Sequence, residues 1–212
     1  MYQFIREAPI TLGLAFVAVL VFLVPGTEQV IEFQANASPF AQIFQALGCH
    51  FAHWSLDHLI WDLLMFVIMG VICERRNPLR YSIVLASSAL AIPWMVMWFA
   101  PEVSSYRGLS GIDTALFGMG IWYLIDGSLR EKNRLWTAIF SIVFLGMFAK
   151  IGYEYLVGGT LFVDNENFIA VPLAHLVGAV IGCLGGFLDL LQDKSSPFGW
   201  QRLPFVRERL PF

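Results

Sequence analysis

Six apolar runs alternate with polar segments along the chain and set its expected architecture. They are Ala8–Val24, Asp57–Cys73, Tyr81–Ala100, Leu109–Ile125, Leu135–Phe148 and Phe168–Leu191. Runs of this kind are typical of membrane-spanning helices, although several are shorter than the ~20 residues that a full crossing needs. We therefore predict an all-α membrane protein, with a bundle of six transmembrane helices over residues 1–191 and a cytoplasmic juxtamembrane tail over residues 192–212.

The connection between the first two runs contains a shorter amphipathic segment. Serine before proline, as in Ser38-Pro39, is typical of a helix start. Apolar side chains then recur at the spacing of one helical face, at Phe40, Ile43, Phe44, Leu47 and Phe51. We predict a helix over about residues 39–53 that lies half-immersed in the outer leaflet. An ordinary packed loop would fit the same pattern.

Composition supports the membrane class. Of the 212 residues, 58% are hydrophobic and only 14% are charged, whereas about a quarter of the residues of soluble domains are charged. The formal net charge of -3 gives no reason to expect a nucleic-acid partner, because such partners are bound by clusters of basic residues. The partners that this composition predicts are the lipid bilayer and other membrane proteins. It does not predict an oligomeric state.

The basic residues are distributed asymmetrically. Only Arg107 and Lys150 lie at the ends of the apolar runs that we expect on the outer side. The others are Arg6, Arg75, Arg76, Arg80, Arg130, Lys132, Arg134, Lys194, Arg202, Arg207 and Arg209. Because cytoplasmic loops carry an excess of Lys and Arg, this distribution predicts that both termini lie in the cytoplasm.

Three polar residues inside the runs fall at matching depths. Ser110, His175 and His58 precede the acids that end their runs (Asp126, Asp189 and Glu74) by 16, 14 and 16 residues, which corresponds to heights of about 24, 21 and 24 Å. Polar groups at membrane depth are functional candidates by default. A serine within reach of a histidine is the minimal pair for acyl transfer, because the imidazole can take the hydroxyl proton as attack begins.

Small residues indicate that two of these helices pack closely. Ala174, Gly178, Gly182 and Gly186 recur every four residues, and Gly111 and Ala115 do the same on the run that carries Ser110. Such ridges let helix backbones approach in lipid. Simple helix packing, with His175 bonded to a backbone carbonyl, would explain the glycines alone. The matching depth of Ser110 and His175 favours catalysis.

Three motifs together resemble the rhomboid intramembrane serine proteases. They are Gly108-Leu109-Ser110-Gly111, Ala174-His175-x-x-Gly178-x-x-x-Gly182 and His53-Trp-Ser-Leu-Asp-His58. The resemblance implies that Ser110 is the nucleophile, that His175 is the general base, and that His58 and the Ser110 backbone N–H form the oxyanion hole. It also implies substrates anchored in the membrane, cleavage near the outer face, a bacterial-type inner membrane, and no metal or cofactor.

A finer resemblance concerns the segment Tyr106-Arg-Gly-Leu-Ser-Gly111. Within the family, this context and the short chain look most like the rhombosortase branch, whose members are associated with trimming C-terminal sorting tails of exported proteins.

The chain departs from the family pattern at three places. Asp62 stands where the family usually has Asn, one turn after the second-helix histidine, and Thr114 stands where an aromatic residue commonly follows the serine. The Trp-Arg pair that is frequent in the family's first outer loop is absent. These departures concern the composition of the oxyanion hole and the orientation of the histidine.

Two acids, Asp62 and Asp113, lie about one turn below the serine, at heights of about 18–20 Å on the same scale. In one hypothesis they share a proton, because two buried carboxylates at one level do not both ionise readily, and a protonated Asp62 donates to the oxyanion. In another, ionised Asp113 orients His175 as a third triad member. In the third, both acids simply bond to nearby hydroxyls such as that of Thr114.

Two alternative functions also have to be considered, a metal site and a protein without catalytic activity. Potential zinc ligands crowd the entrance to the second apolar run, at Cys49, His50, His53, Asp57 and His58, but their spacing matches no familiar ligand pattern. The second alternative is a catalytically inactive rhomboid-like protein that binds membrane clients without cutting them. Such proteins typically lack the serine or the histidine, and this chain keeps both.

Overall fold

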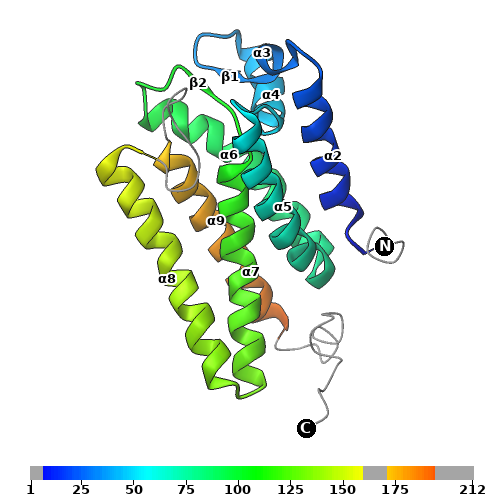
Figure 1. Ribbon diagram of the computed structural model, residues 1–212, viewed down its shortest axis with the longest axis vertical. Coiled ribbons are helices and arrows are strands. Elements are labelled where there is room, and N and C mark those ends of the chain that lie inside the picture. The colour runs from blue at the N-terminus through cyan, green and yellow to red at the C-terminus, as the bar shows by residue number, and fades with distance from the viewer. Residues whose placement is uncertain (1–6, 160–170, 194–212) are drawn as a thin grey trace.

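The computed structural model describes residues 7–159 and 171–193, which are almost entirely helical (Figure 1). The N-terminal part contains α2 (Pro9–Leu23), α3 (Thr27–Ile31), β1 (Phe33–Gln34), α4 (Pro39–Gly48) and the 3-10 turn η1 (Cys49–Phe51). The rest contains α5 (Leu56–Arg76), α6 (Pro78–Phe99), β2 (Ser105–Tyr106), α7 (Ser110–Arg130), α8 (Arg134–Val157) and α9 (Pro172–Asp193). Each of the six apolar runs therefore contributes one of the long helices.

Within residues 7–159 and 171–193, four helices are long and apolar enough to cross a membrane, namely α5, α6, α8 and α9. Helix α2 is apolar but has only 15 residues. Helix α7 has 21 residues and includes the acids Asp113 and Asp126. It packs against α5, α6, α8 and α9, so protein rather than lipid surrounds much of its length, and such a position tolerates polar residues. The chain is thus a multi-pass, all-α membrane protein.

Two buried acids tie helix ends together: Glu74 joins the end of α5 to the start of α2, and Asp189 joins the ends of α5, α7 and α9. Near the end of α5, Glu74 accepts hydrogen bonds from the backbone N–H groups of Ile10 and Thr11 (2.9 and 2.8 Å), and thereby caps the start of α2. Near the end of α9, Asp189 accepts from the Tyr123 hydroxyl of α7 (2.7 Å) and from the Asn77 side chain that follows α5. The three helices therefore run in the same direction.

Helix α9 lies directly against α7 through its small residues. A Cβ atom at Gly178 would collide with the carbonyl oxygen of Gly111, and one at Gly182 would collide with that of Ala115. The two backbones approach this closely only because side chains are missing from the contact. This packing sets Ala174 and His175 beside the start of α7.

The first connection contains the predicted amphipathic helix, shortened to α4 and continued by η1. The Ser38 side chain caps α4 by accepting from the Ala41 N–H (3.3 Å). The helix buries Gln42, Gln45 and Ala46 and exposes an apolar face made of Phe40, Ile43, Phe44 and Leu47. Its immersion in the outer leaflet remains a prediction.

The predicted end of the fifth helix is wrong. The apolar run was expected to stop at Phe148, but α8 continues to Val157 and ends where Gly158 adopts a left-handed conformation (φ 73°). Lys150, which follows the predicted end of the run, therefore lies on the helix. It pairs with Glu154 one turn later (2.7 Å), and two charges that neutralise each other in this way do not interrupt a helix.

The last helix begins at Pro172 within the described residues. The predicted start at Phe168 lies outside them, as does most of the predicted tail. Residues 192 and 193 belong to α9.

A two-stranded antiparallel ladder joins the first connection to the segment before α7. It pairs Phe33 with Tyr106 and Gln34 with Ser105. The ladder fixes the approach of the chain to Gly108 and Ser110.

Candidate active site

A cavity of about 620 Å³ opens between α5, α7, α8 and α9. Most of its wall is apolar, with Trp61 and Met65 from α5 and Val143 and Met147 from α8. Its polar lining gathers the predicted residues from separate helices: His58 and Asp62 (α5), Ser110 and Asp113 (α7), and His175 (α9), joined by Glu154 (α8). Cavities that are largely apolar with a few convergent polar groups are typical of binding and active sites.

Ser110 is the first residue of α7, and the turn before it is tightly held. Gly108 has φ +120°, a conformation that strongly favours glycine. A Cβ atom there would lie 2.9 Å from Cε1 of His58. The Gly108 N–H donates to the Cys49 carbonyl (3.1 Å), and the Leu109 N–H donates to Oδ2 of Asp62 (2.9 Å). These contacts fix the position of the serine relative to α5.

His50 supports the same turn from the other side. Its Nδ1 lies 3.3 Å from the Gly108 carbonyl and its Nε2 lies 3.0 Å from the Ala89 carbonyl of α6. Burial lowers the pKa of His50, so the ring is neutral near pH 7 and donates to only one of the two carbonyls. The sequence suggested His50 as a possible metal ligand, whereas in the structure it contacts the backbone of the turn before Ser110.

Ser110 and His175 face the same cavity from neighbouring helices. The contact that brings them together is one residue away on each helix, where a Cβ atom at Gly111 would lie 3.2 Å from the Ala174 carbonyl oxygen. The described part of the chain contains no hydrogen bond between the Ser110 hydroxyl and His175. Such catalytic hydrogen bonds are often long before substrate binds and tighten in the complex. Thr114 donates to the Ser110 carbonyl (2.8 Å), not to either acid.

Asp62 acts as an acceptor in this geometry. Its Oδ2 receives the Leu109 N–H and lies 3.2 Å from Nε2 of His53 and 3.3 Å from Nε2 of His58. Oδ1 of Asp113 is buried and has no hydrogen-bond partner among the described residues, and no hydrogen bond there joins the two carboxylates. These contacts indicate that Asp62 is an ionised acceptor. They do not support the hypothesis that Asp62 and Asp113 share a proton.

Glu154 is the residue that sequence reasoning missed. It is 1% exposed, and its Oε2 lies 2.8 Å from Nδ1 of His175. Its Oε1 accepts from the Lys150 ammonium (2.7 Å). The hypothesis that Asp113 orients His175 is therefore not supported, because Glu154 occupies that place. The sequence does contain an indication of this residue, because Lys150 and Glu154 lie four residues apart in an apolar stretch. The predicted helix ended at Phe148, so it did not include this pair.

The candidate zinc ligands do not converge. His53 and His58 both face Asp62, His50 faces two backbone carbonyls, and the Cys49 thiol lies 3.6 Å from the Ala46 carbonyl oxygen. Among the residues that the structure describes, no group of three or more His, Cys, Asp or Glu side chains is arranged to hold a metal ion.

At the side of the cavity nearer the ladder, Arg107 lies over the ring of Trp54, 3.4 Å from its centroid, and 3.5 Å from Glu32. A guanidinium over an indole face is a favourable cation–π arrangement. The family's Trp-Arg pair is absent from the first outer loop of this chain, but a tryptophan and an arginine from different segments meet beside the candidate site.

Comparison with known proteins gives consistent matches. The model of the Rhomboid domain family matches residues 41–192. The chain is 27% identical over 191 residues to a protein named Rhomboid protease GlpG from Yersinia pestis (strain Pestoides F). It is 25% identical over 191 residues to the protein of the same name from Serratia proteamaculans (strain 568). Each alignment covers 87% of this chain, and the chain spans 64% of the length of these relatives.

Proposed function

Since this chain belongs to the rhomboid family, whose model matches residues 41–192, we propose that it is an intramembrane serine protease that cleaves membrane-anchored proteins near the outer face of the membrane. The observation that carries the proposal is the meeting of Ser110 from α7 and His175 from α9 in one largely apolar cavity. The names of the relatives as rhomboid proteases support it.

In this proposal, Ser110 Oγ attacks the scissile carbonyl and His175 takes its proton. The contacts of His175 show which ring nitrogen can take the proton. Nδ1 lies against the Glu154 carboxylate, which accepts a hydrogen bond from Nδ1–H and leaves the lone pair of a neutral ring on Nε2. Nε2 is therefore the base, and it returns the proton to the leaving amine.

The oxyanion would form at the start of α7. Backbone N–H groups in the first turn of a helix have no partner within the helix, and the helix dipole favours negative charge there. The Ser110 N–H is such a group, and His58 lines the same cavity. Asp62 contributes by holding the Leu109 N–H and the two imidazoles in place.

The apolar walls of the cavity indicate how a substrate would reach the serine. Aromatic and aliphatic side chains of both α5 and α8 line it, so the apolar residues that flank a scissile bond in a transmembrane segment can pack against these two helices. As the substrate class we propose single-pass proteins, including the C-terminal sorting tails of exported proteins that the resemblance to the rhombosortase branch implies.

The proposed topology places six helices across a bacterial-type inner membrane with both termini in the cytoplasm. The shared ends of α5, α7 and α9 coincide with basic residues: Arg75 and Arg76 end α5, Arg80 lies at the start of α6 and Arg130 ends α7. Because positive charge marks cytoplasmic loops, this end of the bundle faces the cytoplasm and the serine opens toward the outer side.

Cleavage in lipid vesicles tests the proposal. The full chain is reconstituted with a model single-pass substrate, and the products are identified by mass spectrometry. Wild type should cut the substrate and Ser110→Ala should not, whereas Ser82→Ala on α6 should cut at the wild-type rate. Equal activity of wild type and Ser110→Ala would refute the assignment of the nucleophile. Binding of the substrate without any cleavage would favour the inactive, client-binding alternative.

A further inference from the structure

The described part of α8 buries few of its side chains, and Glu154 is one of them. The other two are Met147 and Ile151, and all three line the cavity. A carboxylate is costly to bury unless charged or hydrogen-bonding partners compensate it. Glu154 has such a partner on each oxygen, and one of them is the histidine of the candidate dyad.

From these contacts we propose that Glu154 is a positioning residue that turns the Ser110–His175 pair into a triad. This inference rests on the proposed function, because it assigns Glu154 its role through His175. Glu154 comes from a different helix than either partner, so α7, α8 and α9 each supply one member.

The contact at Nδ1 decides which nitrogen of His175 carries the proton. An ionised carboxylate only accepts hydrogen bonds, so Oε2 at 2.8 Å favours the tautomer with a proton on Nδ1. Nε2 is then free to accept from the serine hydroxyl. The same negative charge stabilises the imidazolium that forms during attack. Because Glu154 is 1% exposed, water screens this interaction weakly.

Lys150 fixes the orientation of the carboxylate. Its ammonium donates to Oε1 across one helical turn, which holds the carboxylate in its ionised form and leaves Oε2 directed at His175. An ammonium has three donors and no acceptor, so whatever atom occupies the Oε1 position must be an acceptor. An amide at this position must therefore turn its oxygen, not its NH₂ group, toward Lys150.

Replacing Glu154 by Gln should produce the wrong tautomer of His175. The amide has one acceptor oxygen, and Lys150 will hold it, which turns the NH₂ group toward Nδ1. Nδ1 must then accept, so the proton moves to Nε2, where it blocks proton transfer from Ser110. When the triad acid of a serine protease is changed to its amide in this way, kcat falls by about 10⁴-fold. We expect a loss of at least about 10³-fold here, with KM little changed.

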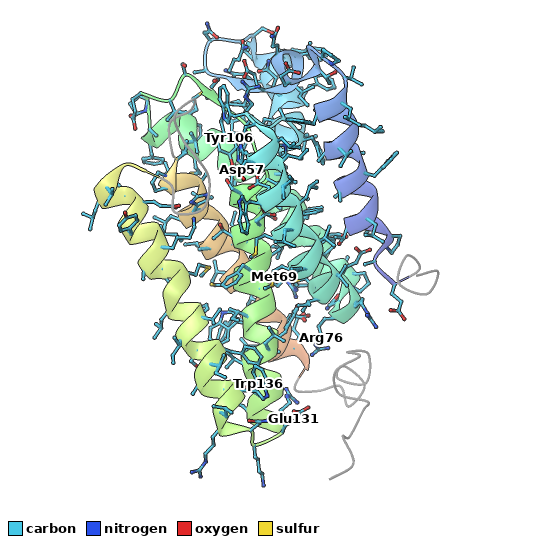
Figure 2. The ribbon with its side chains drawn as sticks, viewed as in Figure 1. Asp57, Met69, Arg76, Tyr106, Glu131 and Trp136 are labelled. Atoms are coloured by element: carbon cyan, nitrogen blue, oxygen red, sulfur yellow. The ribbon has the colours of Figure 1, made fainter. Side chains whose placement is uncertain are left out.

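Removing Lys150 should restore part of the activity. In the double variant Lys150→Met with Glu154→Gln, the amide is free to turn its oxygen toward His175 and to favour the productive tautomer again. We expect kcat at least about tenfold above that of Glu154→Gln, because the geometry returns but the charge does not. Glu154→Asp should also keep more activity than Glu154→Gln. The matched control is Glu131→Gln at the opposite end of the bundle (Figure 2), which should have the kinetics of wild type.

The experiment combines kinetics on the transmembrane substrate with ¹⁵N NMR of histidine-labelled protein, in which His175→Asn assigns the ring signals. Wild type should show a proton on Nδ1 of His175, and Glu154→Gln should show it on Nε2. A purely structural tie between α8 and α9 predicts that Lys150→Met lowers the melting temperature further and rescues nothing. Wild-type kcat in Glu154→Gln, or an unchanged tautomer, would overturn the proposal.

The NMR measurement separates this proposal from the proposed function. If wild type shows no activity that depends on Ser110, the protease assignment fails, while the tautomer still reports on Glu154. If wild type is active and the tautomer does not respond to Glu154→Gln, only the role of Glu154 fails. Should Glu154→Gln not fold, the double variant and Glu154→Asp decide the matter. We expect measurable Ser110-dependent activity in both variants, and its complete loss in both would contradict the proposal.

Discussion

At the scale of single residues, the two acids beneath the serine have different surroundings. Oδ2 of Asp62 accepts from the Leu109 N–H and lies within 3.3 Å of two imidazole nitrogens, whereas Oδ1 of Asp113 is buried without a partner in the described part of the chain. Their common depth could be read from the sequence, because it depends only on helical rise. Their partners could not, because these come from segments whose packing no spacing rule fixes.

This difference predicts unequal effects of neutralising each acid. Asp62→Asn should lower the free energy of unfolding by about 1–3 kcal/mol, since it removes a charged acceptor from several donors. Asp113→Asn, the matched change, should lower it by less, because Oδ1 of Asp113 has no hydrogen-bond partner to lose among the described residues. Denaturant titration in detergent micelles measures both. Equal losses in the two variants would instead favour the shared-proton hypothesis.

A second prediction at this scale concerns Gly108. Alanine there would adopt an unfavourable φ and place its Cβ against His58, so we expect a loss of about 1–3 kcal/mol of stability together with most of the activity. Gly26→Ala is the control. Gly26 also has positive φ (+85°) but nothing within 4 Å of a Cβ, so stability should fall while kcat stays unchanged. Wild-type kcat in Gly108→Ala would contradict the role of the turn.

At the scale of elements, the apolar pattern predicted where each long helix lies but not where each one ends. The run at Leu135–Phe148 predicted α8, and the pairing of Lys150 with Glu154 then carried that helix to Val157. Hydropathy alone treats both residues as breaks in a run, although two opposite charges one turn apart stabilise a helix. This missed end is also why Glu154 was missed.

The contact between α7 and α9 gives a prediction at the element scale. Gly182→Ala should destabilise the protein by about 1–3 kcal/mol or more, because its methyl group would collide with the Ala115 carbonyl. Gly152→Ala on α8, where a Cβ would meet nothing within 4 Å, should instead stabilise by up to about 1 kcal/mol through helix propensity. Thermal unfolding in detergent compares the two. If both substitutions are tolerated alike, the close packing of α7 and α9 is not needed for stability.

At the scale of the whole molecule, basic residues gather where α5 and α7 end and α6 begins, at Arg75, Arg76, Arg80 and Arg130. Tyr106 and the start of α7 lie at one end of the bundle, and Glu131, which follows Arg130, lies at the other (Figure 2). The family resemblance that the motifs indicated is confirmed by the family match over residues 41–192. The motifs predicted Ser110, His175 and His58, but only the folded chain shows that α8 contributes an acid to the same cavity.

The orientation of the molecule in the membrane follows from this polarity and can be measured. Glu131→Cys should react with a membrane-impermeant maleimide only after cells are permeabilised, because the distribution of basic residues predicts that this end lies in the cytoplasm. Glu28→Cys on α3 should react in intact cells. Of the native cysteines, Cys49 and Cys73 are buried and Cys183 is partly exposed, so the protein without an introduced cysteine gives the background. The reverse labelling pattern would invert the proposed topology.

The central claim is that Ser110 is a nucleophile activated by His175. A fluorophosphonate probe tests it most directly, because the probe reacts covalently with an activated serine and needs no knowledge of the substrate. Wild type in lipid vesicles should be modified at Ser110, as mapped by mass spectrometry, with no labelling in Ser110→Ala and labelling at least about 100-fold slower in His175→Asn. Failure of wild type to label, or labelling that persists unchanged in Ser110→Ala, would contradict the account.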